Sequence, residues 1–283
     1  MDEYKITAIT IILRSLKPMK TPLIVTSTQN PRIKEIRSME KARVRKDLGL
    51  FCAEGDKEVR LALTGGYRIE TLVYCSELVK DIRNHPAIQA AENLIEVSLE
   101  LFGTLAVREN SGGLLAVCHQ RTHTLKDFKL SQCPLILVLE SVEKPGNLGA
   151  LLRTADAAGL DGVIICDNQT DVYNPNVIRS STGCLFTMPL AITTSAEAIN
   201  YLKHNNIKIW CTHLEASHPY YSTDFKSPSA IVMGTESTGL SEIWTNNSAG
   251  NIIIPMHGKT DSMNVSTAAA VVIFEALRQR TMI

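Results

Sequence analysis

Apolar runs alternate with helical patterns along the second half of the chain, which indicates an α/β fold. The runs are apolar throughout, as expected for strands buried on both faces of a mostly parallel sheet. They lie at Leu135–Leu139, Val163–Cys166, Ile207–Thr212, Ile231–Met233 and Ile252–Ile254, with helical patterns near 148–158, 195–204 and 264–279. Because such sheets bind ligands beyond the carboxyl ends of their strands, we expect the functional residues in the loops that follow the runs.

The first half of the chain predicts a smaller α/β domain. Its pattern indicates helices at 31–46 and 55–64 and strands at 50–53, 70–74 and 114–118. Between His119 and Cys133 the sequence becomes polar and loses its apolar period, which predicts a linker. We therefore expect an N-terminal extension at 1–21, a first domain at 22–118, a linker at 119–133 and a second domain at 134–283.

Composition is that of a globular protein. The 283 residues are 45% hydrophobic and 20% charged, which suits two domains with buried cores. No apolar stretch approaches the roughly 20 residues of a membrane-spanning helix, and the N-terminus lacks the charge order of a secretory signal. The seven cysteines form no C-x-x-C pair, which argues against a zinc site and a disulfide framework. We expect a cytoplasmic protein with no metal and no membrane contact.

Positive charge gathers in the first half of the chain. Residues 1–133 hold 20 of the 29 basic and 16 of the 29 acidic residues, so this part carries a net charge of +4 and the rest a net charge of −4. The excess is concentrated between Arg32 and Lys46. A polyanion such as RNA would meet this segment first, although a solvated helical face is the ordinary alternative. The expected RNA contacts are Arg32, Lys34, Arg43, Arg45 and Lys46.

The loop after the first apolar run leads into a helix with one isolated charge. Pro145 and Gly146 predict a turn, Asn147 is a suitable N-cap, and Gly159 is a suitable residue just past the helix end. Arg153 stands alone among alanines and leucines of this helix. A guanidinium in that place can hold a phosphate or stabilise a developing oxyanion, whereas a surface salt bridge is the plainer interpretation.

Two later loops complete the set. The loop within Ile231–Leu240 places Glu236 between Gly234 and Gly239, without the lysine of a phosphate-binding loop. The loop after Ile252–Ile254 carries Ser262 and Asn264, which taken alone are suitable helix caps. No G-x-G-x-x-G, H-E-x-x-H or G-x-S-x-G is present, which disfavours dinucleotide-binding, metalloprotease and α/β-hydrolase chemistry.

Together the three loops resemble the signature motifs of the SpoU-type RNA 2′-O-ribose methyltransferases of the SPOUT superfamily. The matching segments are PGNLGALLRTADAAG at 145–159, MGTESTGL at 233–240, and IPM at 254–256 followed by SMNVS at 262–266, with NPNVIRSSTG at 174–183 similar to the connecting segment. Residues 22–118 resemble the family's L30e-like substrate-binding domain through STQNPRIK and FCAEG. Lys144 stands where the family often has Asp, and Met263 where Leu is usual.

The resemblance implies a catalytic domain with a trefoil knot, a homodimer, and S-adenosylmethionine (AdoMet) as cofactor. By resemblance the cofactor-binding residues are Thr212, Gly234, Ile254, Met256 and Met263. Arg153 is implied to activate the ribose 2′-hydroxyl, and the residues implied to shape the site with it are Asn147, Glu236, Ser262 and Asn264. Structured RNA is the implied partner, and the accessory domain favours ribosomal RNA. The alternatives are a tRNA methyltransferase, a non-catalytic RNA-binding protein that kept the fold, and a doubly wound enzyme acting on a small metabolite.

Overall fold

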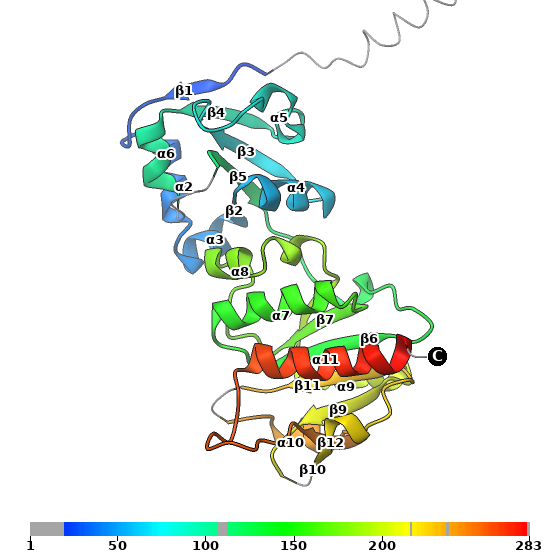
Figure 1. The fold of residues 1–283 in the computed structure, drawn as a ribbon. Coiled ribbons are helices and arrows are strands. Elements are labelled where there is room, and N and C mark those ends of the chain that lie inside the picture. Colours follow the sequence, from blue (N-terminus) through cyan, green and yellow to red (C-terminus); the bar gives the residue numbers. More distant parts are fainter. Residues whose placement is uncertain (1–19, 107–111, 216, 236–237, 282–283) are drawn as a thin grey trace, which may run out of the picture. The chain divides into compact units, whose positions relative to one another are not determined.

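The computed structural model describes residues 20–106, 112–215, 217–235 and 238–281, and it divides into two compact units (Figure 1). The first unit contains the described residues up to Val44 together with Leu48–His119, and the second contains Arg45–Asp47 and the residues from Gln120 onward. Most of the expected extension at 1–21 lies outside the described residues.

The first unit is built on a mixed sheet, which within the described residues has five strands in the order β1-β4-β3-β5-β2. β5 pairs antiparallel with both β2 and β3, and the remaining pairs are parallel. The strands are β1 (Leu23–Val25), β2 (Leu50–Glu54), β3 (Ile69–Tyr74), β4 (Asn93–Val97) and β5 (Leu114–His119). The helices are α2 (Pro31–Ser38), α4 (Asp56–Thr64), α5 (Pro86–Ala90) and α6 (Leu99–Leu105), while α3 (Ala42–Leu48) is divided between the two units. The short β1, β4, α5 and α6 were not expected from the sequence.

The single helix expected at 31–46 is wrong, because the chain breaks between α2 and α3. Asn30 caps α2 by accepting a hydrogen bond from the Arg32 N–H. At the other end Met39 closes the last turn, and its side chain is only 2% exposed in the core of this unit. Burial of this side chain directs the chain out of the helix, a tertiary effect that helical periodicity does not contain.

The second unit contains a fully parallel sheet, as the sequence predicts. Its seven described strands lie in the order β10-β12-β9-β11-β6-β7-β8. They are β6 (Leu135–Glu140), β7 (Gly162–Cys166), β8 (Leu190–Thr193), β9 (Lys208–Thr212), β10 (Ser217–Pro219), β11 (Ser229–Met233) and β12 (Gly250–Ile253). The helices are α7 (Pro145–Ala157), α8 (Pro175–Ser180), α9 (Ser195–His204), α10 (Glu242–Thr245) and α11 (Val265–Thr281). The short β8, β10, α8 and α10 escaped the sequence pattern.

Helices cover both faces of this sheet. α7 and α11 lie side by side over one face (Figure 1). On the other face α9 and Trp244 of α10 pack on alternate side chains of the strands, among them Ile136 and Val138 of β6. β6, β7 and β11 are buried along their whole length, which explains their unbroken apolar sequence.

The segment expected as a linker belongs largely to the second unit. It contains a short 3-10 helix at Leu125–Asp127, and Phe128 packs in the same core cluster as α9. The His123 carbonyl accepts a hydrogen bond from the Ile192 N–H at 3.1 Å, which ties the segment to β8. The segment is therefore packed on the surface of the second unit.

Candidate active site

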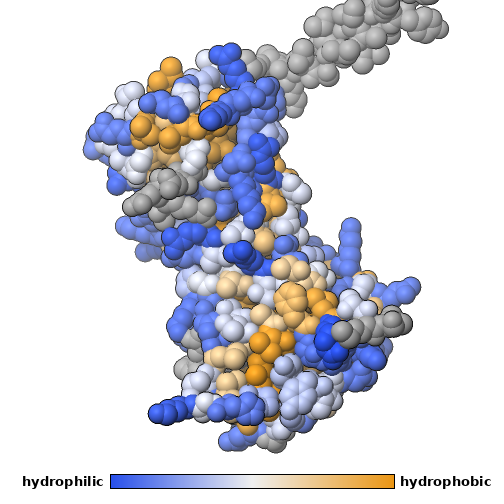
Figure 2. Space-filling model, viewed as in Figure 1, coloured by the Kyte–Doolittle hydropathy of each residue, from blue (hydrophilic) through white to orange (hydrophobic). Residues whose placement is uncertain are grey.

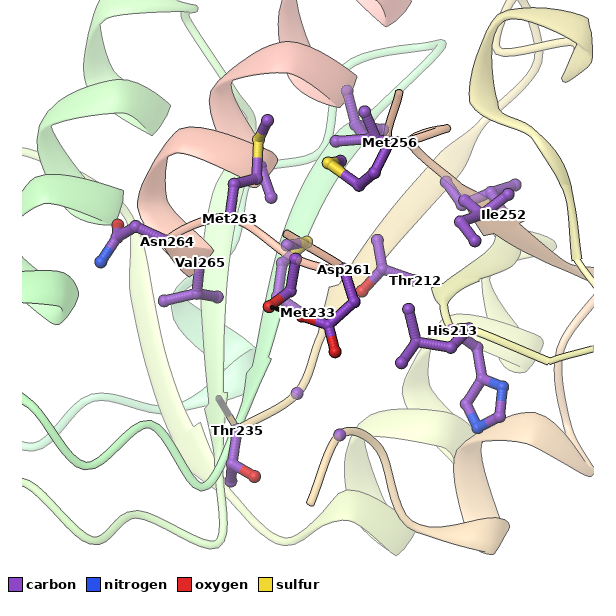
Figure 3. Close-up of a pocket in the computed structure, with 18 of the residues that line it drawn as sticks. Thr212, His213, Met233, Thr235, Ile252, Met256, Asp261, Met263, Asn264 and Val265 are labelled. Atoms are coloured by element: carbon purple, nitrogen blue, oxygen red, sulfur yellow. Dashed lines mark hydrogen bonds between the residues drawn. The ribbon is translucent and has the colours of Figure 1, made fainter. Parts of the chain in front are cut away.

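A cavity of about 790 Å³ lies at the carboxyl ends of β9, β11 and β12, where the sequence placed the chemistry (Figure 3). Thr212 ends β9 and Met233 ends β11 at its wall. All five residues expected to bind the cofactor line it, and these are Thr212, Gly234, Ile254, Met256 and Met263. Ser262 and Asn264 line it as well. The second and third loops therefore meet around one space.

Gly234 is required by a close approach of the chain to itself. Thr235 and Gly239 exchange two backbone hydrogen bonds of 3.1 and 3.2 Å, which fold the second loop back on its own start. A Cβ at Gly234 would lie 2.3 Å from the Gly239 carbonyl oxygen and 2.7 Å from the Leu240 nitrogen. Only glycine fits there, so the cavity wall is bare backbone at this point. Glu236 lies outside the described residues.

The third loop is joined to the first by a pair of amides. The Asn264 Nδ2 group donates to Asn147 Oδ1 at 3.1 Å, and Asn264 Oδ1 accepts from the Ser266 N–H at 3.0 Å at the start of α11. Asn264 thus caps α11, as its position suggested, and also contacts the first loop. A second cavity of about 200 Å³ lies beside Asn147 and shares Gly234 and Lys144 with the larger one.

The predicted start of α7 is wrong by about one turn. The helix begins at Pro145 with Lys144 as its cap residue, so Asn147 lies inside the first turn and does not cap. Proline is suited to the first helical position because its missing N–H would be unpaired there. This placement leaves the Asn147 side chain available for Asn264. The predicted helix end is confirmed, since Gly159 follows the last turn with a φ of +64°.

Arg153 lies on the surface of the single chain. It is exposed, it lines neither cavity, and within the described part of the chain its guanidinium has no hydrogen-bond or ion-pair partner. Along the axis of α7 it lies about 9 Å from Asn147. The surface salt bridge considered from the sequence is therefore not formed by described residues, and this cation faces solvent.

Glu140 is a site residue that sequence reasoning missed. It ends β6, is only 6% exposed, and accepts hydrogen bonds from both the backbone N–H (2.8 Å) and the hydroxyl of Ser241. Ser241 follows the second loop directly, so this carboxylate fixes the end of that loop to the start of the first. One feature of the sequence could have indicated this role, because Glu140 is a single acidic residue at the end of an otherwise apolar strand. A carboxylate buried in such a place needs hydrogen-bond partners.

The basic segment is exposed except at one residue. Arg32, Lys34, Arg43 and Lys46 are exposed. Arg45 belongs to the second unit, where its side chain is 1% exposed and paired with Asp171 through Nε at 2.8 Å and through a terminal nitrogen at 2.5 Å. The charge of Arg45 is therefore already neutralised in the interior, which disfavours it as an RNA contact, while its four exposed neighbours remain predicted contacts.

The cysteines have the character of small buried apolar residues. Five of the seven are buried, and burial raises the pKa of Cys211 to about 12, so this thiol stays neutral. The part of the chain that the structure describes contains no cluster of three or more side chains suited to a metal ion. It also contains no helix with the length and apolar character to cross a bilayer.

The comparisons with known proteins cover both units. The chain matches the SpoU rRNA methylase family over residues 134–274 and the MRM3-like substrate-binding domain over residues 30–116. It is 28% identical over 251 residues to the Bacillus subtilis 23S rRNA (guanosine(2553)-2′-O)-methyltransferase RlmP, covering 88% of this chain and 97% of that protein. It is 30% identical over 263 residues to an uncharacterized tRNA/rRNA methyltransferase of Synechocystis sp., covering 90% and 94%.

Solved structures agree with the sequence comparison. The crystal structure of an AdoMet-bound rRNA methyltransferase from Sinorhizobium meliloti aligns with a TM-score of 0.84 at 32% identity, covering 90% of this chain and 97% of that one. The likeness extends through the parallel sheet and the smaller mixed sheet, and it confirms the α/β fold class expected from the sequence. The chain belongs to the SpoU rRNA methylase family.

Proposed function

We propose that this protein transfers the methyl group of AdoMet to a ribose 2′-hydroxyl of ribosomal RNA. The observation that carries the proposal is the cavity at the strand ends, because it gathers all five expected cofactor residues and is joined through Asn264 to Asn147 of α7. Of the relatives named above, RlmP is a 23S rRNA 2′-O-methyltransferase and the Sinorhizobium meliloti protein is an rRNA methyltransferase, which supports the same substrate class.

The cavity suits a nucleoside-type cofactor with a charged sulfur. Its volume is within the range of small-molecule sites, and Gly234 brings bare backbone to its wall. Ile254, Met256 and Met263 supply apolar surface for an adenine ring, and the backbone of Gly234 supplies polar groups. When bound, AdoMet supplies an electrophilic methyl group on a sulfonium. The residues proposed to hold it are Thr212, Gly234, Ile254, Met256 and Met263.

In the proposed mechanism the chain positions the ribose oxygen and stabilises its negative charge. Asn264 lines the larger cavity and Asn147 lines the smaller one beside it, at the start of α7, where we propose that the hydroxyl approaches. Arg153, whose guanidinium has no partner among the described residues, stabilises the developing alkoxide and holds a neighbouring phosphate. Alignment of oxygen, methyl carbon and sulfur supplies much of the rate. Ser262 and Glu236 complete the proposed site.

RNA docking is proposed for the exposed basic residues of the first unit. Arg32, Lys34 and Arg43 are exposed, as is the neighbouring Lys46, and phosphate contacts make binding steeply dependent on salt. Charge reversal of Arg32 and Lys34 should weaken RNA binding and flatten its salt dependence. Unchanged affinity at low salt would exclude this docking surface.

A cytoplasmic location is proposed because ribosomal RNA is the proposed substrate.

The homodimer and the trefoil knot remain proposals for the second unit. Apolar side chains gather over α11 on the face shown in Figure 2, and Phe274 of that helix is 50% exposed. A second copy would cover this surface. Phe274→Glu should convert a dimer to a monomer in sedimentation experiments. The knot is proposed on the ground of family membership.

Methyl transfer separates this proposal from its alternatives. Purified protein, AdoMet with a labelled methyl group, and either total rRNA or total tRNA should give label in rRNA, at a nucleotide that becomes resistant to alkaline hydrolysis. Label in tRNA alone would favour a tRNA methyltransferase. RNA binding without label, and without heat on titration with AdoMet, would favour a non-catalytic RNA-binding protein. The Arg153→Ala variant is the negative control for methyl transfer. Because Arg153 is exposed, its replacement should leave the fold unchanged.

A further inference from the structure

The cavity wall carries a carboxylate that no step above uses. Asp261 lies on the loop between β12 and α11 and lines the cavity, and its side chain points into the space beside Met233 and Thr212 (Figure 3). The Ser262 hydroxyl donates to Asp261 Oδ1 at 3.2 Å. Asp261 is exposed, and among the described residues nothing hydrogen-bonds to its other carboxylate oxygen, so this oxygen is available to a ligand in the cavity.

Asp261 lies on the same loop as Asn264, which borders the start of α7 where the ribose is proposed to approach. Asn264 is three residues further along and is hydrogen-bonded to Asn147 in the first turn of α7. Because the methyl group must face the side from which the ribose oxygen approaches, the sulfur it leaves lies at this end. Among the described residues that line the cavity, Glu215 is the other carboxylate. It follows β9, on a different wall, and its backbone N–H donates to His213 Nδ1 at 3.0 Å.

The charge near Asp261 changes during the proposed reaction. The ribose oxygen forms a bond to the methyl carbon and loses its proton to water, while the C–S bond breaks and its electron pair stays on sulfur. The sulfonium of AdoMet thereby becomes the neutral thioether of S-adenosylhomocysteine (AdoHcy). The rest of the molecule keeps its charge, so a carboxylate close to sulfur attracts the donor and has no such attraction for the product.

We infer that Asp261 is the specificity-determining residue that makes this site prefer the cationic donor to the neutral product. The inference rests on the proposed function, since it takes AdoMet as the cofactor. Lys144 and His213 also line the cavity, but neither carries a negative charge that would attract a sulfonium. Asp261 therefore favours loading with AdoMet and eases release of AdoHcy after each transfer.

The test is a set of calorimetric titrations on the full-length protein, with no RNA and no turnover. AdoMet, AdoHcy and sinefungin, which carries an ammonium group near the position of the sulfonium, are titrated into the wild type and three variants. Asp261→Asn removes the charge at nearly constant shape, and Asp261→Glu keeps it. Glu215→Gln is the matched control, because it removes a carboxylate from another wall of the same cavity.

We expect Asp261→Asn to weaken AdoMet and sinefungin by about fivefold while AdoHcy binding stays within twofold. Asp261→Glu should retain most of the preference, and Glu215→Gln should leave the ratio of the two affinities unchanged. Equal weakening of all three ligands, or no weakening, would overturn the inference while the proposed function stands. A wild-type protein that binds none of the adenosyl compounds would overturn the proposed function itself.

Discussion

Replacing Gly234 by alanine tests whether the second loop forms the wall of the cofactor site. The added Cβ would lie 2.3 Å from the Gly239 oxygen and 2.4 Å from the Gly239 carbonyl carbon, both backbone atoms that cannot rotate aside. To reach ordinary contact the turn must recede by about 1 Å, and overpacking of this kind costs about 1–3 kcal/mol. A displacement of that size in a wall that contacts the cofactor is expected to weaken AdoMet binding at least about tenfold.

The assay compares Gly234→Ala with Gly258→Ala. Gly258 lies on the loop between β12 and α11, and a Cβ there would meet no atom within 4 Å. Calorimetry should show loss of AdoMet affinity only for Gly234→Ala. The melting temperature of this variant should fall by about 2–12 °C, since each kcal/mol shifts a domain of this size by about 2–4 °C. If Gly234→Ala bound AdoMet as tightly as the wild type, this turn would not be the cofactor wall.

Three further predictions concern chemistry, stability and pH. Arg153→Ala should abolish methyl transfer while AdoMet affinity stays within twofold, and wild-type turnover in that variant would remove Arg153 from the mechanism. Arg280 of α11 donates to the backbone carbonyls of Phe225 (2.8 Å), Cys133 (2.7 Å), Pro134 (3.2 Å) and Ser227 (2.9 Å), so Arg280→Met should lower the unfolding free energy by at least about 3 kcal/mol in urea titrations. Arg278→Met, which removes the ion pair of a more exposed arginine with Glu275, is its control, and equal stability of the two variants would refute the stabilising role of the Arg280 hydrogen bonds. Burial and the neighbouring Arg121 lower the pKa of His123 to about 4. Between about pH 6.5 and 4 the unfolded chain therefore binds a proton at this residue that the folded chain does not bind. The free energy of unfolding should consequently fall as the pH falls through that window. His123→Gln should flatten this loss by up to about 3 kcal/mol, and an identical acid-unfolding profile would contradict the assignment.

The sequence predicted the second unit well because its strands are buried on both faces. Unbroken apolar runs such as β6 and β11 carry a strong local signal, and ligand loops follow from the parallel arrangement. Short elements at the sheet edges carry little signal. β8 has four residues and β10 three, and their strand character comes from pairing with a neighbour.

Arg45 shows the limit of charge patterning. In the sequence it is one of several equivalent cations between Arg32 and Lys46, and no local feature separates it from Arg43. Its burial depends on Asp171, which lies 126 positions further along the chain. The same reasoning explains the missed role of Glu140, whose partner Ser241 lies 101 positions away. Partners at such separations are set by tertiary structure, so the composition of a segment cannot reveal them.

The two long-range links also explain why the three loops behave as one site. Glu140 ties the end of the second loop to the start of the first, and Asn147 ties the first loop to the third. The first loop is therefore bonded to both loops that line the larger cavity, although of its own residues only Lys144 lines that cavity. A shift of the first loop on RNA binding would consequently reach the cofactor wall through hydrogen bonds. For this reason cofactor affinity and methyl transfer must be measured separately in every variant of these loops.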